Sequence, residues 1–97
     1  MDQADLAASW GATIRARVER RRIYPPAARG AQGTVVLRLT VARDGRLIAA
    51  DLARGSGNGA LDDAALQAAR RAGRFPAAPA ALTGAQFRFD LPMTFAR

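Results

Sequence analysis

The chain has no histidine and no cysteine. It therefore lacks the usual general base near neutral pH, the thiolate nucleophile and the commonest zinc ligands, and we expect neither an enzyme nor a cofactor or metal site. Without cysteine, no disulfide indicates the redox compartment. Lysine is missing as well, because all fifteen basic residues are arginines, and the formal net charge is +7.

Long apolar runs are also missing. No stretch approaches the roughly 18 residues that a membrane-spanning helix needs, and Met1 is followed by Asp2 rather than by the start of a signal peptide. We expect a soluble segment taken from a longer chain. The 97 residues suit one small domain, and because many of its apolar residues are alanines, the core must depend on few Leu, Ile, Val and Phe.

The first segment, Asp5 to Arg22, predicts an amphipathic helix. Large apolar residues recur there at every fourth position, and arginines gather near the C-terminal end, where the helix dipole favours positive charge. Tyr24-Pro25-Pro26 ends the helix. The large apolar residues are Leu6, Trp10, Ile14 and Val18.

Two extended segments joined by Asp44-Gly45 predict a β-hairpin. The first opens at Gly33, and Val or Leu fills every second position. In the second, Arg46 to Arg54, the apolar residues again alternate, which is typical of a half-buried strand. The alternating residues are Val35, Leu37, Leu39 and Val41 in the first segment, and Ile48, Ala50 and Leu52 in the second.

A second helix is predicted after the loop Gly55 to Gly59. Asn58 is a suitable N-cap, Asp62 and Asp63 lie in the first turn, and arginines lie near the end. The residues expected to face the sheet are Leu61, Ala65, Ala68 and Ala72. Phe75-Pro76 and Pro79 begin a connector.

The last segment, Ala85 to Phe95, predicts a third strand. Its alternate residues are Phe87, Phe89, Leu91, Met93 and Phe95. Pro92 has no N–H group and is tolerated in a sheet chiefly on an edge strand or at a bulge, so this strand is expected at the sheet boundary.

The element order α-β-β-α-β predicts an α+β fold. A right-handed crossover places the third strand antiparallel to the first, in a three-stranded antiparallel sheet of order 2-1-3. Both helices then cover the face that carries Leu37 and Phe89, which gives a two-layer sandwich.

Other functional patterns are weak. The glycine cluster Gly55 to Gly59 lacks a following lysine and precedes two carboxylates, which disfavours phosphate binding. The arginines between Arg15 and Arg22 spread around a helix, although with the +7 charge they leave a nucleic-acid-binding module as one alternative. The adjacent Asp62 and Asp63 diverge by about 100° on a helix and cannot converge on one substrate.

Seven short pieces, in this order and spacing, resemble the TonB C-terminal domain family, and they span about Tyr24 to Phe95. They are Ile23-Tyr24-Pro25, Gly33-Thr34-Val35, the turn from Val41 to Gly45, Ser56-Gly57, the run from Leu61 to Leu66, Phe75-Pro76 and the run from Leu91 to Phe95. We accordingly divide the chain into an N-terminal helix, residues 1–23, and a TonB C-terminal-like part, residues 24–97, in one compact domain.

The resemblance implies a periplasmic domain of an energy transducer that is anchored in the inner membrane by a segment outside this chain. Such a domain binds the TonB box of outer-membrane transporters and passes on energy from ExbB-like and ExbD-like partners for uptake of substrates such as siderophores. Tyr24-Pro25 corresponds to the family's Gln-Pro-x-Tyr-Pro segment, in which Arg21 and Arg22 here replace the Gln and the first Pro. No nucleic acid is expected, and the domain is expected to be a monomer or weak homodimer.

The edge position of the last strand supplies a mechanism, because an extended peptide can add to a free strand edge by main-chain hydrogen bonds. A related TolA-like envelope domain is the nearer alternative function. Under the leading hypothesis, the expected partner-binding residues are Arg21, Arg22, Tyr24, Pro25, Gln86, Arg88, Phe89, Asp90, Leu91 and Thr94.

Overall fold

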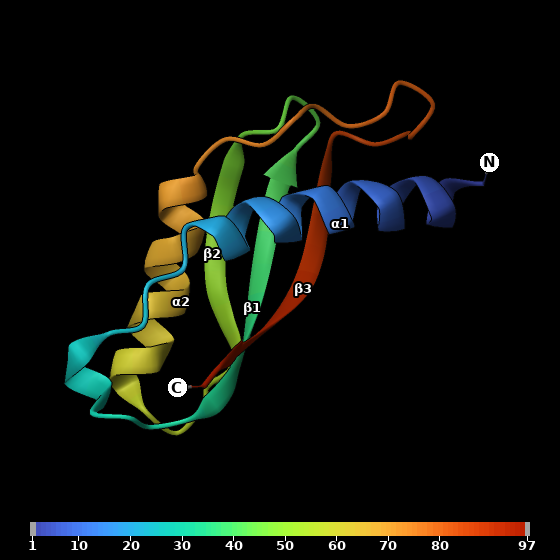
Figure 1. Ribbon diagram of the computed structural model, residues 1–97. Helices are drawn as coiled ribbons and strands as arrows, with labels where there is room; N and C mark the ends of the chain where they lie inside the picture. The colour runs from blue at the N-terminus through green and yellow to red at the C-terminus, as the bar shows by residue number, and fades with distance from the viewer. Residues whose placement is uncertain (1, 97) are drawn as a thin grey trace.

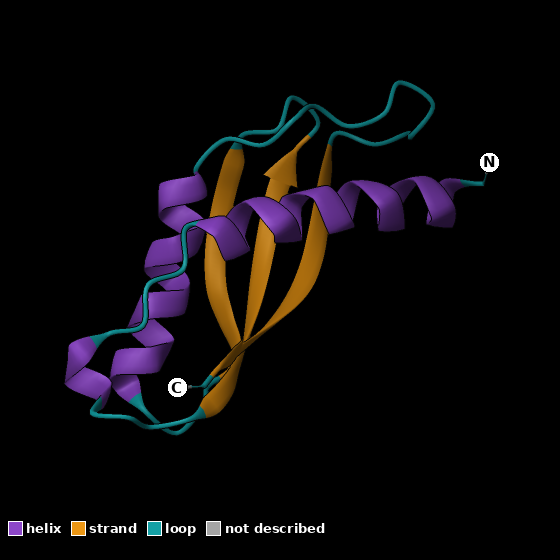
Figure 2. Ribbon diagram, viewed as in Figure 1, coloured by secondary structure: helices purple, strands orange, loops and turns teal. Residues whose placement is uncertain are grey.

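The computed structural model describes residues 2–96, and its strands form one antiparallel sheet of order β2-β1-β3. Both helices lie on one face of this sheet (Figure 1, Figure 2). The predicted two-layer α+β fold is therefore confirmed. The elements are α1 (Gln3–Arg20), the 3-10 helix η1 (Pro26–Ala28), β1 (Gly33–Ala42), β2 (Leu47–Arg54), α2 (Gly59–Ala72) and β3 (Gln86–Phe95).

The core lies between the helices and the sheet. The β1 residues predicted to face the helices are fully buried, as are Ile14 and Val18 of α1. Phe87 and Phe89, in contrast, are only partly buried against the core. The connector after α2 adds Phe75 and Leu82, which the sequence did not predict. The other large core residues are Trp10, Val35, Leu37, Leu39, Val41, Leu61, Leu91, Met93 and Phe95.

The second helix begins at the predicted N-cap. The Asn58 side chain accepts hydrogen bonds from the N–H groups of Ala60 and Leu61 at 3.0 and 3.1 Å, which satisfies two of the free donors of the first turn. The predicted inward stripe is correct except at its end. Ala69 is buried there, whereas Ala72 is only half-buried.

The predicted hairpin turn is present and requires glycine. Gly45 donates its N–H to the carbonyl of Ala42 at 2.9 Å and has a φ of +93°. A Cβ at this position would lie 1.9 Å from the carbonyl oxygen of Phe75, so no larger residue fits. Asp44 accepts the N–H of Arg46 at 3.0 Å, and this hydrogen bond lowers the pKa of the Asp44 carboxyl.

The predicted alternation along the second strand is wrong at Ile48, whereas Leu52 lies opposite the buried Leu37 as the alternation requires. The ladder pairs Thr40 with Ala49 and then Val41 with Leu47, so Ile48 has no partner in β1 and the inward position passes to Leu47. Ile48 is 47% exposed, and Leu52, at the outer margin of the sheet, is 42% exposed.

The first helix is shifted from its predicted range. It begins at Gln3, after Asp2 caps it by accepting the N–H of Asp5 at 2.9 Å, and it ends at Arg20 rather than Arg22. It crosses the strands, and its N-terminal half extends beyond β3 (Figure 1). Across residues 2–96, no helix combines the length and apolarity needed to cross a membrane.

Contacts along its length hold α1 over the edge of the sheet. The Trp10 Nε1 group donates to the carbonyl of Pro76 at 2.8 Å, and the Trp10 ring meets Phe87 and Phe89 edge-on at 5.3 and 5.5 Å. Near the N-terminus, Gln3 bonds to the connector, since its amide donates to the carbonyl of Ala81 and accepts from the N–H of Thr83, both at 2.8 Å. The overhanging half of α1 is therefore fixed.

Candidate functional site

The edge formed by β3 is regular. The ladder between β1 and β3 runs from Gly33 opposite Phe95 to Ala42 opposite Gln86 without a register shift. Just beyond it, Arg43 donates its N–H to the carbonyl of Ala85 at 3.0 Å. Hydrogen-bonded pairs alternate with non-bonded pairs in an antiparallel ladder. The main-chain N–H and carbonyl groups of the odd-numbered β3 residues therefore bond to β1, and those of the even-numbered residues point away from β1.

We call the side of β3 that faces away from β1 the outer flank. Pro92 lies on this flank, so its missing N–H removes no bond from the ladder, and the predicted edge position of the strand is confirmed. Within residues 2–96, the outer-flank N–H and carbonyl groups of Gln86, Arg88 and Asp90, and the carbonyl of Pro92, have no hydrogen-bond partner. These groups form an unfilled template for another strand.

Arg22 closes one end of the outer flank. Its guanidinium donates a hydrogen bond to the carbonyl of Thr94, the last outer-flank carbonyl of the strand. The same guanidinium lies 5.4 Å from the centroid of the Phe95 ring and 3.5 Å from the Glu19 carboxylate. The unfilled carbonyls of the flank therefore run from Gln86 to Pro92.

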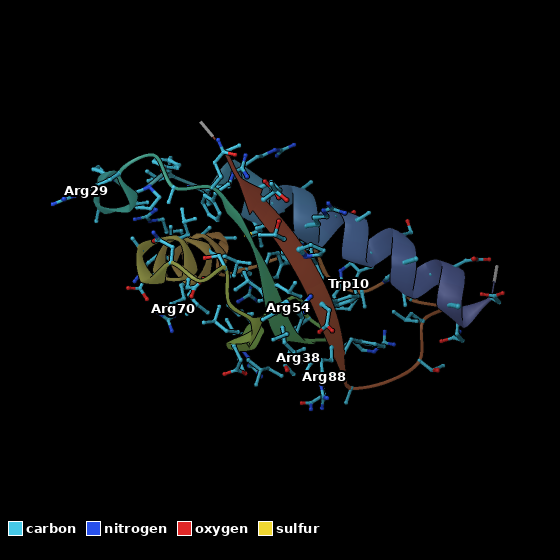
Figure 3. All side chains as sticks on the ribbon, turned by 90° about the horizontal axis from the view of Figure 1, so that it is seen from below. Trp10, Arg29, Arg38, Arg54, Arg70 and Arg88 are labelled. Atoms are coloured by element: carbon cyan, nitrogen blue, oxygen red, sulfur yellow. The ribbon has the colours of Figure 1, made fainter. Side chains whose placement is uncertain are left out.

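The open face of the sheet, away from the helices, carries charge beside this flank. Arg38 of β1 donates two hydrogen bonds to Asp90, at 2.9 and 3.1 Å. The hydrogen bonds lower the pKa of the Asp90 carboxyl and raise the pKa of the Arg38 guanidinium. Arg88, on the same face, forms no ion pair with any residue from 2 to 96. Figure 3 shows Arg38 and Arg88 on the side of β3 away from α1.

A groove of about 510 Å³ runs between α1 and β3. From β3 it is lined by residues that include the outer-flank positions Asp90 and Pro92. From α1 it is lined by five small residues together with Arg15 and Glu19, and Gly11 packs against the strand, because a Cβ there would lie 3.0 Å from two ring carbons of Phe89. The full lining is Ala7, Ala8, Gly11, Ala12, Arg15, Ala16, Glu19, Phe89, Asp90, Leu91 and Pro92.

The structure brings only some of the predicted partner-binding residues together. Gln86, Arg88, Asp90 and Thr94 lie on the outer flank, and Arg22 contacts its end. Phe89 and Leu91 turn their side chains toward the helices and line the groove. Arg21 is exposed just after α1, and no ion pair or hydrogen bond of its side chain joins it to β3.

Tyr24 and Pro25 lie elsewhere. The Tyr24 hydroxyl donates to the carbonyl of Ala31 at 2.9 Å, which holds the segment after α1. Pro25 lines a second hollow, of about 310 Å³, between this segment and α2. Exposed Ile23 lies at the same hollow.

Sequence reasoning missed the contribution of α1 to the site. Apart from Arg15 and Glu19, the groove-lining residues of α1 are alanines and a glycine, which pattern analysis treats as ordinary surface residues. Their spacing, at Ala8, Gly11, Ala12 and Ala16, is a helical stripe that could have been noticed, but only the fold shows that it faces the free edge of a strand.

Comparison with models of known protein families identifies the family to which the chain belongs. The family described as Gram-negative bacterial TonB protein C-terminal matches residues 20–96. The chain belongs to this family. This match confirms the resemblance found in the sequence. TonB C-terminal domains are non-catalytic protein-interaction domains associated with transport. The comparison with curated protein sequences found no match.

Solved structures of TonB-like domains share the fold. The solution structure of the Helicobacter pylori TonB C-terminal domain (residues 179–285) is 20% identical to the chain, with a TM-score of 0.77 over 100% of this chain and 95% of that one. The HasB C-terminal domain is 31% identical, with a TM-score of 0.57 over 89% and 68%. TolAIII, in a structure with a peptide derived from the N-terminus of TolB, is 27% identical, with a TM-score of 0.67 over 88% and 73%.

Proposed function

We propose that this TonB domain docks the TonB box of an outer-membrane transporter by adding it as a fourth strand along β3. The observation that carries the proposal is the outer flank of β3, where N–H and carbonyl groups from Gln86 to Pro92 have no partner within residues 2–96. An extended peptide satisfies such groups by main-chain hydrogen bonds, and its side chains add specificity.

The expected affinity suits a reversible coupling. A guest strand along this flank makes about four to six hydrogen bonds, each worth roughly 0.5–1.5 kcal/mol net. Ordering of the peptide opposes part of this gain. A moderate affinity lets the transducer release the transporter after each cycle.

The rest of the proposed function concerns the cell envelope. The domain lies in the periplasm, and a part of the protein outside this chain anchors it in the inner membrane and contacts ExbB-like and ExbD-like proteins. Energy from the proton-motive force passes through the docked strand to the transporter, for uptake of substrates such as siderophores. The membership of the chain in the TonB family supports these assignments.

The charges beside the flank favour an acidic guest side chain. Asp90 is already bonded to Arg38, whereas Arg88 has no ion pair within residues 2–96. A guest residue opposite Arg88 on the open face therefore gains most from a carboxylate. The pairing is exposed and contributes chiefly to register and encounter rather than to affinity.

Titration of the domain with a synthetic TonB-box peptide tests strand addition. The peptide comes from a transporter of the same organism, and amide chemical shifts are recorded at each step. We expect the largest shifts between residues 86 and 92 and small shifts in β2. Large shifts confined to other elements would contradict docking at β3.

N-methylated peptides supply a matched control for this titration. Alternate peptide amides face β3, and the others face solvent. Methylating the amides that face β3 is expected to weaken binding about tenfold or more, whereas methylating the other set changes it about threefold at most. Equal effects of the two sets would rule out a strand-like guest.

A TolA-like envelope role is the second candidate, and the likeness to the peptide-bound TolAIII structure favours it. The two functions differ in the partner that the domain retains. A pull-down from an envelope extract of the same organism that recovers TolB-like or Pal-like proteins and no transporter would support this role and contradict the TonB assignment.

A further inference from the structure

The groove between α1 and β3 has two different walls. The β3 wall presents the unfilled main-chain groups of Asp90 and the unfilled carbonyl of Pro92. The α1 wall, which we call the roof, consists of the groove-lining residues of that helix, and for most of its length it has no side-chain atom beyond Cβ. The roof residues are Ala7, Ala8, Gly11, Ala12, Arg15, Ala16 and Glu19.

The roof is held in place independently of any guest. Trp10 anchors the middle of α1 through its hydrogen bond to Pro76 and its ring contacts with Phe87 and Phe89. Gln3 fixes the N-terminal overhang to the connector at Ala81 and Thr83. A wall that does not move on binding selects its guest by size, because it cannot relax around a larger side chain.

We infer that α1 is the specificity wall of the docking site, which admits only guest strands with small or medium apolar side chains on the side that faces the roof. The inference rests on the proposed function, because the guest must first lie along β3. Side chains of a strand alternate between its two faces, so every second guest residue beside β3 turns toward the roof and the others turn toward the open face.

An extended, acidic and apolar segment fits this groove best. The unfilled N–H and carbonyl groups require an extended backbone. The alanines and Gly11 of the roof have no polar side-chain atoms, so apolar guest side chains can pack against them without displacing a hydrogen bond. Arg88 on the open face forms no ion pair within residues 2–96, so it favours a carboxylate among the guest side chains that face away from the roof.

A pair of neighbouring substitutions on α1 tests the roof. Ala12 and Thr13 are both exposed, and they point about 100° apart around the helix, but only Ala12 lines the groove. Ala12→Leu fills the groove, whereas Thr13→Leu is the matched control. With the TonB-box peptide as the probe, we expect Ala12→Leu to weaken binding about tenfold or more and Thr13→Leu to change it about twofold at most.

A peptide with glycine at the roof-facing positions completes the test, since it leaves room for the added leucine. Its affinity is expected to be nearly equal for Ala12→Leu and wild-type domains. If both domains bind the unmodified peptide equally well and the shifts at residues 86 to 92 are retained, α1 does not select the guest, although docking at β3 still holds. If the wild-type domain shows no such shifts, both the specificity role of α1 and docking at β3 are contradicted.

If the Ala12→Leu variant does not fold, amide shifts of the wild-type domain test the same role of α1. During titration of the wild-type domain, the amides of Ala8, Gly11 and Ala12 are expected to shift along with those of β3. Ser9 and Thr13, on the other side of the helix, are expected to stay nearly unchanged. Shifts of β3 with no change in α1 would contradict the inference.

Discussion

The sheet has two free edges, and they are built differently. Along β2, the ladder to β1 is interrupted by two irregularities, one at each end of the strand. The chain after α2 also covers the start of this edge, because Arg74 bridges Arg46 and Leu47 donates its N–H to the carbonyl of Gly73 at 3.4 Å. Along β3, the ladder is unbroken and its outer flank stays unfilled from Gln86 to Pro92.

The difference shows how one small sheet can avoid aggregation at one edge and stay available at the other. Bulges and a covering segment are common ways to prevent edge-to-edge pairing, and β2 has both. On β3 the protection is limited to Pro92, which removes one donor, and to Arg22, which occupies the carbonyl of Thr94. This contrast supports the proposal that β3 is the edge to which a guest strand adds.

The largest expected effect compares leucines on the two edge strands. Leu91 of β3 is 3% exposed, whereas Leu52 of β2 is 42% exposed. Leu91→Ala is expected to lower the free energy of unfolding by about 2–5 kcal/mol, because it leaves a cavity in the core. Leu52→Ala is expected to cost about 0.5 kcal/mol or less. Urea denaturation of both variants measures the difference, and equal losses would contradict the contrast in burial.

The next effect concerns binding. Arg88→Pro removes an outer-flank N–H and places a ring in the path of the guest, while the ladder to β1 keeps its bonds. Peptide affinity is expected to fall about tenfold or more. Ala50→Pro is the matched change on β2, since Ala50 pairs with Leu39 and also turns its N–H away from β1. If calorimetric titration shows that Ala50→Pro weakens binding as much, the guest uses the other edge.

A smaller effect is expected at the end of the flank. Arg22→Ala releases the carbonyl of Thr94, so a peptide extended by two residues toward that end gains one hydrogen bond, worth about threefold to tenfold in affinity. The unextended peptide is expected to bind as before. Arg20→Ala, at the exposed end of α1, is the control. Weaker binding of the extended peptide to Arg22→Ala would show that Arg22 contacts the guest rather than limiting the edge.

The smallest effect is the pH dependence of the β1–β3 ion pair. Asp90 has a lowered pKa in the folded state because Arg38 donates hydrogen bonds to its carboxylate. A carboxyl with a lowered folded-state pKa adds stability above its unfolded-state pKa of about 3.9, and that stability is lost as the pH falls through the folded-state value. When the free energy of unfolding is measured as the pH is lowered below about 4, the Asp90→Asn variant is expected to lose slightly less of it than the wild-type domain. The effect is small because Arg38 and Asp90 are both exposed to solvent. An identical profile would mean that the pair adds nothing.

The sequence predicted the features that depend on neighbouring residues. The Asn58 cap, the Asp44-Gly45 turn and the edge position of Pro92 each follow from the backbone requirements of one residue type, and all are present. The strand order followed from the handedness of a single crossover. Local chemistry and simple topology were sufficient for the fold and for the choice of edge.

The features that the sequence could not show depend on distant contacts. The inward position of Leu47 results from a bulge at Ile48, and an alternating pattern does not distinguish a regular strand from a bulged one. The groove exists because Trp10 reaches Pro76 and Gln3 reaches Thr83, contacts between residues far apart in the chain. Alanines in a helix carry no indication of which neighbour they will face.

Amide hydrogen exchange along β3 tests the central claim most directly. In the free domain, the N–H groups of Phe87, Phe89 and Leu91 are bonded to β1 and should exchange slowly, whereas those of Gln86, Arg88 and Asp90 should exchange fast. We predict that a bound TonB-box peptide slows exchange at the even-numbered residues only. Even-numbered amides that are already protected in the free domain, or that stay fast at saturating peptide, would contradict docking on this edge.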